Sequence, residues 1–319
     1  MNTNKHENLV STAQFDKDSK EKFEEWENIL VGRDIHSIRS QIYDMIFDSA
    51  VFQCINESRR YAAKNDKGND KINKMLHYFI NQSFFKTQLV SIRRLVDKDF
   101  GRVKKGKQYT VYSLYNLIED LKKNKALLTR GNILAVRDLP YDYEQAMEEF
   151  KNDTGYTQGP FIPPHPIECS EDIHRRIDSI VGIKPDKRNP DDQVLNEDGF
   201  KYFDDWLEIS QELYDYVNKY IVHAATPESR FKVLDKDEIE GALGKVLNAH
   251  KVICETACFI GNSLLFCGFG EVLSISQYGR FDQYDLFEYL DEPVASKETI
   301  GELKEFWEKY RMETEQWSR

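Results

Sequence analysis

Three polar residues near position 220, Asn218, Lys219 and His223, have the side chains that cleavage of an RNA phosphodiester requires. A histidine can take or give a proton at the attacking or leaving oxygen, and a cation can neutralise the charge that gathers on the phosphate. Lys219 and His223 are four residues apart, so on a helix they share one face. We expect His223 to transfer the proton, Lys219 to supply the cation, and Asn218 to orient the phosphate or the histidine.

Each of these residues also has a purely structural interpretation. A histidine at a helix C-terminus interacts favourably with the helix dipole and can cap its last carbonyls. A lysine on a helix is usually solvated, and it lacks the planar fork that arginine offers a phosphate. An asparagine at this place can simply mark the fraying end of the helix, so the sequence leaves both interpretations open.

A helix with one buried face is expected to position these residues. Apolar or small residues recur at intervals of three and four, the spacing of a single helix face. They are Phe203, Trp206, Leu207, Ser210, Leu213, Val217, Tyr220, Ile221 and Ala224. This pattern predicts a helix over residues 201–223, with Val217 buried and Asn218, Lys219 and His223 off the buried face.

The remaining apolar patterns predict further helices and an all-α fold class. Helices are expected over about 21–31, 35–63, 72–98, 110–123 and 236–266, and a last one follows Ser296. Ile35, Met75, Phe79 and Leu243 are among the expected apolar-face residues. Four long helices with one apolar stripe each indicate an antiparallel four-helix bundle, because each stripe must be covered by its neighbours.

The predicted organisation has three parts. Residues 1–34 form an N-terminal extension, residues 35–266 form the bundle with a proline-containing insertion at about 140–200, and residues 267–319 form an aromatic linker with a C-terminal helix. Within the insertion, Ser170 is the expected N-cap of a short helix, because Glu171 and Asp172 would then lie in its first turn.

The charge balance excludes a uniformly basic nucleic-acid binder. The chain has 319 residues, of which 31% are charged, and its formal net charge is −11. Contact with RNA would therefore need a local basic patch. The strongest one combines the loop Arg102–Lys107 with Lys122, Lys123 and Lys125, close to Tyr109, Tyr112 and Tyr115. Such a patch can hold a strand and stack its bases, although charge runs in loops are usually solvated.

The cysteines and the termini indicate no metal site, no cofactor and no membrane. The five cysteines are spread out without a C-x-x-C pair, and Cys254 and Cys258 are better explained as buried residues on an apolar helix face. Arg94 and Asp97, three residues apart on one helix face, are expected to form structural ion pairs, either with each other or with a neighbouring helix. The first thirty residues lack an apolar signal segment and no long apolar run occurs, so we expect a soluble, cytoplasmic protein.

Two segments together resemble the AbiU-type abortive-infection group of HEPN proteins. The first is the helix 83–97, which ends in Arg94-Leu-Val-Asp97, followed by the Ser113-Leu-Tyr-Asn-Leu-Ile-Glu-Asp-Leu121 helix. The second is Asn218-Lys219-Tyr-Ile-Val-His223, which lies where that group has an Arg-Asn/Asp-Lys-x-x-x-His motif. The similarity covers roughly residues 70–125 and 200–265.

The resemblance implies a four-helix bundle, a homodimer and, in active members, a ribonuclease that uses an arginine and a histidine without a metal. In this chain Val217 occupies the position of that arginine, and no histidine has an arginine five to seven residues before it. We therefore expect a prokaryotic defence protein that binds or cleaves RNA through the face of His223. The alternative is an inactive HEPN-like module that binds a protein partner through its aromatic C-terminal region.

Overall fold

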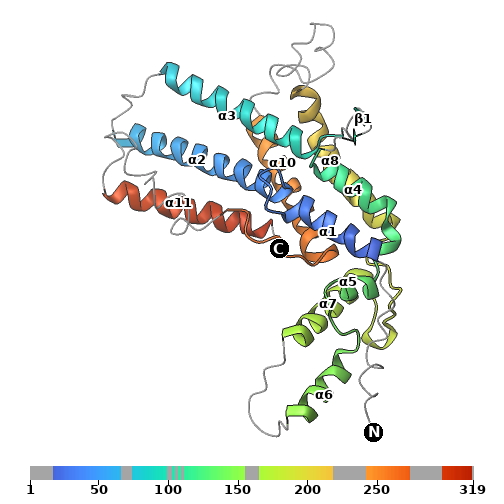
Figure 1. The fold of residues 1–319 in the computed structure, drawn as a ribbon. Helices are drawn as coiled ribbons and strands as arrows, with labels where there is room; N and C mark the ends of the chain where they lie inside the picture. The colour runs from blue at the N-terminus through green and yellow to red at the C-terminus, as the bar shows by residue number, and fades with distance from the viewer. Residues whose placement is uncertain are drawn as a thin grey trace, which may run out of the picture.

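The structure is a computed structural model that describes residues 17–65, 74–98, 103–104, 107–108, 111–154, 165–217, 242–273 and 297–317. Helices dominate these residues (Figure 1), and the described strands are the two-residue β1 (Val103–Lys104) and β2 (Lys107–Gln108), which pair antiparallel. The predicted all-α fold class is confirmed.

Four helices share the central hydrophobic core. They are α2 (Ile38–Asn65), α3 (Lys74–Leu95), α8 (Glu197–Tyr216) and α10 (Ala242–Phe259). Helix α2 contacts α3, α3 contacts α8, α8 contacts α10, and α10 contacts both α2 and α3. Residues of their apolar stripes, such as Ile46, Leu89, Phe203 and Ile253, are almost completely buried. Over most of its length each stripe is therefore covered by the neighbouring helices, as the periodicity requires.

Three more helices pack against this core. Helix α1 (Lys17–Val31) contacts α2 and α4 (Leu114–Lys123), and α11 (Lys297–Gln316) lies along α2 (Figure 1). The buried indole of Trp26 in α1 donates a hydrogen bond of 2.8 Å to Asp120 of α4. Trp307 of α11 packs edge-on against Phe47 of α2, with ring centroids 6.3 Å apart. The buried aromatic residues of α11 thus serve the interior of this molecule.

A smaller group of helices projects from this body as an arm, seen at the bottom of Figure 1. It contains α5 (Arg130–Val136), α6 (Tyr143–Thr154) and α7 (His165–Val181), together with the short turns η1 (Lys125–Leu127) and η2 (Pro185–Lys187). Arg137, at the end of α5, joins the arm to the body. It pairs with Glu27 of α1 and donates a hydrogen bond of 2.6 Å to the Leu265 carbonyl, just after the π-helical turn η5 (Ile260–Leu264).

Two local predictions about helix starts are wrong. Ile35 is 75% exposed and lies before α2, which starts at Ile38. Ser170 is not an N-cap, because α7 already starts at His165 and the buried Ser170 hydroxyl donates to the Pro140 carbonyl at 2.6 Å. Pro166 is compatible with this earlier start, since a proline in the first helical turn removes no intrahelical hydrogen bond.

The first turns of α3 also differ from the prediction. Met75 and Phe79, expected on its buried face, are 78% and 65% exposed, and Leu243 at the start of α10 is 41% exposed. Figure 1 shows that this end of α3 extends beyond the described part of α8, so the described residues of α8 do not cover the stripe there. Among the described helices, none is both long enough and apolar enough to cross a membrane.

Candidate functional site

The predicted site residues Asn218, Lys219 and His223 lie outside the described residues. The structure does describe the helix that leads to them. Helix α8 starts after Asn196, whose side chain accepts a hydrogen bond from the Gly199 amide. Val217, which caps the C-terminal end of this helix, has 0% exposure. The predicted burial of Val217 is confirmed. The position where the resembling group has its arginine therefore lies within the hydrophobic core.

An arginine and a histidine do meet elsewhere on the surface. Arg94 lies in the last turn of α3, and His36 lies in the turn between α1 and α2. One guanidinium nitrogen of Arg94 is 3.0 Å from Nδ1 of His36. Both side chains are exposed. Arginine can only donate hydrogen bonds, so Nδ1 of His36 is the acceptor and the neutral ring carries its proton on Nε2. This pair combines a fixed positive charge with a group that can release a proton.

The turn that holds His36 is fixed by its own hydrogen bonds. Helix α1 ends at Val31, and the next residue is Gly32, where the backbone leaves no room for a Cβ atom because it would clash with the Asn28 carbonyl oxygen. The Asp34 carboxylate then accepts a hydrogen bond of 2.7 Å from the His36 amide. The geometry of this turn is therefore set before any ligand binds.

Gln41 connects the turn to the segment before α4. Its side chain is 8% exposed, and its amide nitrogen donates to the His36 carbonyl at 2.7 Å and to the Tyr112 carbonyl at 3.0 Å. Three segments far apart in the sequence are thereby held together: the α1–α2 turn, the start of α2 and the residues before α4.

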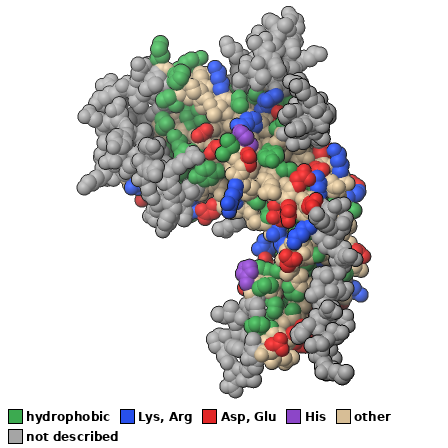
Figure 2. All heavy atoms as spheres, viewed as in Figure 1, with side chains coloured by type: hydrophobic (Ala, Val, Ile, Leu, Met, Phe, Trp, Pro, Cys, Tyr) green, Lys and Arg blue, Asp and Glu red, His purple; other side chains and the backbone are tan. Residues whose placement is uncertain are grey.

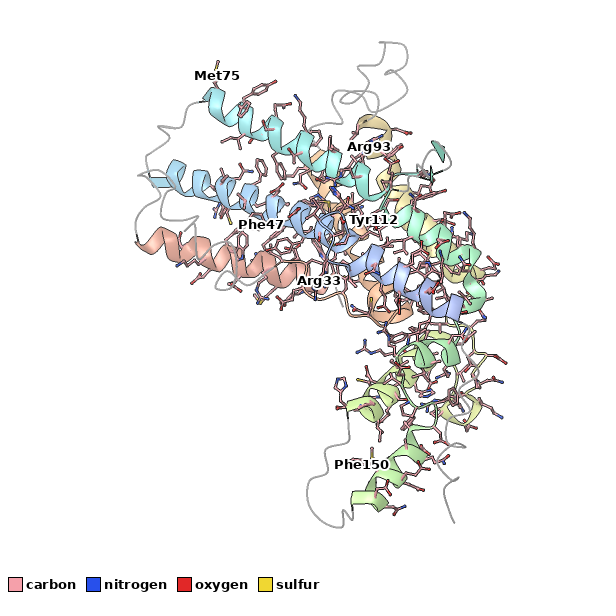
Figure 3. All side chains as sticks on the ribbon, viewed as in Figure 1. Arg33, Phe47, Met75, Arg93, Tyr112 and Phe150 are labelled. Carbon is pink, nitrogen blue, oxygen red and sulfur yellow. The ribbon has the colours of Figure 1, made fainter. Side chains whose placement is uncertain are left out.

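These segments surround an open cavity of about 440 Å³. It is lined by Asp34, His36, Gln41, Arg94, Val111 and Tyr112. In Figure 2, histidine atoms lie between basic and acidic atoms in the middle of the upper body, and Figure 3 labels Tyr112 on the same side of the molecule. A volume of this size is typical of small-ligand sites, which range from roughly 300 to 1,000 Å³.

Arg94 and Asp97 do not form an ion pair with each other. Asp97 instead lies 3.6 Å from Arg93, one helical turn before it, while Arg94 faces His36. The Arg93 guanidinium also lies over the Tyr214 ring of α8, 5.5 Å from its centroid. Successive helix residues point about 100° apart, so the two neighbouring arginines serve different faces of α3.

Two lysines of the predicted basic patch are held in ion pairs. Lys122 lies 2.6 Å from Asp204 of α8 and 2.9 Å from Glu119, and Lys125 pairs with Glu197. Burial alone would lower the pKa of Lys122, but the hydrogen bonds to Asp204 and Glu119 raise it. These lysines join α4 to α8. The side chains of the loop 102–107 and Tyr109 lie outside the described residues.

A second polar cluster lies inside the arm and is structural. The side chain of Arg130 is fully buried and lies 2.8 Å from Asp178 and 2.9 Å from Asp192. It also donates at 3.0 Å to Nδ1 of His174, whose Nε2 donates to the Tyr141 carbonyl at 2.9 Å. Burial lowers the pKa of His174 to about 4, so this ring is neutral at pH 7.

A wider cavity, of about 950 Å³, lies where the arm meets the body. It contains His165 and Cys169, whose sulfur is 3.6 Å from the imidazole nitrogens. The other four cysteines are poor nucleophiles, because burial raises the pKa of each thiol, to about 12 for Cys54 and Cys258 and about 11 for Cys267. The predicted burial of Cys254 and Cys258 is confirmed.

Sequence reasoning missed His36 and Gln41 as site residues. A search for an arginine close before a histidine along one helix cannot find a pair in which each residue comes from a different element. In the described part of the chain, no group of three or more histidine, cysteine, aspartate or glutamate residues has an arrangement that could hold a metal. Comparisons of the chain with protein-family models, with curated proteins and with solved structures found no match.

Proposed function

We propose that the protein is a HEPN-like protein of prokaryotic defence type that binds or cleaves RNA, with Arg94 and His36 as the residues that meet the phosphate. One observation carries this proposal: the Arg94 guanidinium lies 3.0 Å from His36 Nδ1 at the wall of an open, ligand-sized cavity. Arg94 also belongs to the Arg94-Leu-Val-Asp97 run on which the family resemblance depends.

The chemistry follows from what each side chain can exchange. A phosphate bound beside Arg94 would receive hydrogen bonds from the guanidinium, which stabilises the charge that develops as the 2′-hydroxyl attacks the phosphorus. Because that phosphate would take over the hydrogen bonds of Arg94, Nδ1 of His36 would be free to bind a second proton. The imidazolium would then give one proton to the departing 5′-oxygen, and the Asp34 carboxylate in the same cavity would accept the proton of the 2′-hydroxyl. Attack by the 2′-hydroxyl leaves a 2′,3′-cyclic phosphate and a free 5′-hydroxyl. No step of this reaction uses a metal ion, which agrees with the metal-independent activity that the family resemblance implies.

The face of Asn218, Lys219 and His223 is the competing location for the same activity. It is supported by the resemblance of residues 218–223 to the motif of the family, and the buried Val217 speaks against a complete motif there. A homodimer, as in the resembling group, is part of the same proposal.

A second candidate function is an inactive HEPN-like module that binds another protein. It is favoured by the exposed apolar residues Met75, Tyr78 and Phe79 on the first turns of α3. Figure 2 shows hydrophobic atoms gathered at this end of the body, and Figure 3 labels Met75 at the tip of the helix. Exposed apolar and aromatic side chains of this kind are frequent anchors of protein interfaces.

Incubation of the purified protein with total RNA in the presence of a chelator tests the proposal. We expect cleavage, and we expect His36→Ala and Arg94→Ala each to reduce its rate by about a hundredfold or more, the usual effect of losing a proton-transfer or charge-stabilising group. His165→Ala is the matched control, because His165 is also an exposed histidine but lies in the arm, and it should leave the rate unchanged.

Three results would contradict this assignment. Full activity of His36→Ala would exclude the Arg94–His36 pair, and if His223→Ala then abolished cleavage, the site would be the 218–223 face. A requirement for magnesium would contradict the metal-free mechanism. If the wild-type protein neither binds nor cleaves RNA, the result favours the protein-binding module.

A further inference from the structure

A second cavity lies on the other side of the turn that carries His36. It measures about 370 Å³, and its lining includes Arg33, Ile35, Arg39, Tyr43 and Phe269. Consecutive residues of the turn alternate between the two cavities: Arg33 and Ile35 line this one, and Asp34 and His36 line the one beside Arg94. The α1–α2 turn is therefore a shared wall between two neighbouring cavities of ligand size.

Both cavities have the same combination of groups. Each has at least one exposed arginine and one tyrosine: Arg94 with Tyr112 on one side, and Arg33 and Arg39 with Tyr43 on the other. Figure 3 labels Arg33 and Tyr112 on one side of the molecule, around the junction of α1 with α2 and α3. An arginine can bind a phosphate and a tyrosine ring can stack on a base, so each cavity has what one nucleotide needs.

The arginines of the second cavity are available to a ligand. Within the part of the chain that the structure describes, Arg33 and Arg39 form no ion pair, although Asp44 and Glu271 line the same cavity. Arg175 and Arg176 of the arm differ in this respect, because both pair with Asp172. In a chain with a net charge of −11, unpaired arginines on one face provide the local attraction that an RNA backbone would need.

The tyrosine of the second cavity is held in place. The Tyr43 ring is half-buried and stacks on Phe47, with centroids 6.2 Å apart and planes 19° from parallel. The wall opposite is fixed as well, because the Asn262 side chain accepts a hydrogen bond of 2.9 Å from the Phe269 amide. A ring that is already ordered loses little conformational freedom when a base stacks on it.

We propose that an unpaired RNA strand crosses the α1–α2 turn, so that one nucleotide lies at Arg94, His36 and Tyr112 and its neighbour lies at Arg33, Arg39 and Tyr43. This inference rests on the proposed function and adds a substrate class to it. A duplex cannot bind in this way, because its bases are stacked inside the helix and cannot reach the tyrosine rings.

Binding of a short unstructured RNA and of its blunt duplex, followed by fluorescence anisotropy at several salt concentrations, tests the inference. With three arginine–phosphate contacts, the slope of log affinity against log salt should be about −2 for the single strand, which is about a twentyfold loss between 50 and 200 mM salt. For the double variant Arg33→Ala/Arg39→Ala, the loss of affinity between 50 and 200 mM salt should be only about threefold. Tyr43→Leu, which keeps an apolar contact with Phe47, should weaken binding by about tenfold or more.

The double variant Arg175→Ala/Arg176→Ala is the matched control and should bind like the wild type. The inference is overturned if the duplex binds as tightly as the single strand, or if Arg33→Ala/Arg39→Ala keeps the wild-type affinity and salt slope. In either case the proposed function survives as long as Arg94→Ala still weakens binding. If neither form of RNA binds the wild-type protein, the proposed function fails together with the inference.

Discussion

At the scale of single residues, the arginine and the histidine that lie side by side come from different structural elements. His36 contributes its ring from a turn fixed by Asp34 and Gln41, and Arg94 reaches it from the end of another helix. A cation in the last turn of a helix is also favoured by the helix dipole, so Arg94 is stabilised in its position beside His36. The geometry of this pair therefore depends on rigid surroundings.

Val217 allows a direct test of the motif interpretation. Val217→Arg should destabilise the fold by about 3 kcal/mol or more, because an unpaired charge would enter a core position with 0% exposure, and it should not create RNase activity. A thermal melt of the variant measures the loss. Tyr202→Arg on the same helix is the control and should be near neutral, because Tyr202 is 63% exposed. A wild-type melting temperature for Val217→Arg, above all with new activity, would show that position 217 opens onto a site.

At the scale of the elements, the arm depends on one buried arginine. Arg130 at the start of α5 pairs with Asp178 of α7 and with Asp192 in the segment after η2. Arg188, also after η2, pairs with Asp178 at 2.7 Å, so that this carboxylate lies between two guanidinium groups. Burial alone would raise the pKa of Asp178, but the hydrogen bonds from Arg188 and Arg130 keep it below its usual value. The short helices of the arm are thus held by charge pairs as well as by apolar contacts.

Arg130→Met should therefore destabilise the arm strongly. Removing one partner of a buried ion pair typically costs about 3–5 kcal/mol, because the remaining charges stay buried without compensation. Hydrogen exchange should show faster exchange in α5 and α7 than in α2 and α3, since the network lies within the arm. Arg175→Met, which removes an exposed arginine from α7, should change little. Equal exchange of Arg130→Met and wild type in α5 and α7 would show that apolar packing alone holds the arm.

At the scale of the whole molecule, two buried histidines connect folding to pH. Burial lowers the pKa of His250 in α10 to about 3, and it also lowers that of His174 to about 4. Among the described residues, neither ring nitrogen of His250 has a hydrogen-bond partner. Both rings gain a proton more readily in the unfolded chain, where the pKa is about 6.5.

The free energy of unfolding should therefore be greatest above about pH 6.5 and should fall as the pH drops toward 4. Between these values the unfolded state binds more protons, and each histidine can contribute a slope of up to about 1.4 kcal/mol per pH unit. Denaturant titrations from neutral to mildly acidic pH measure this slope. His250→Leu should flatten it and should not destabilise the protein at pH 7, because it removes polar atoms without partners from the core. An unchanged slope in His250→Leu would contradict the role of His250.

The sequence by itself determined the elements and their buried faces. The spacing of Phe203, Leu207, Leu213 and Val217 predicts both the helix α8 and the side that it buries, and the structure confirms both. Local periodicity suffices here because a helix places every third and fourth residue on one face, whatever surrounds it. The same reasoning was wrong at Ile35, Met75 and Phe79, where an apolar residue lies beyond the helices that could cover it.

Only the tertiary structure decided which polar residues meet. His36 and Arg94 are 58 positions apart, and Arg130 and Asp178 are joined across two helices, so no spacing rule along one helix could pair them. The same holds for Lys122, a lysine of the predicted RNA-binding patch that pairs with Asp204 across two helices. Charged side chains can pair with many partners, and the choice among these depends on the distances that the packing of the apolar faces sets.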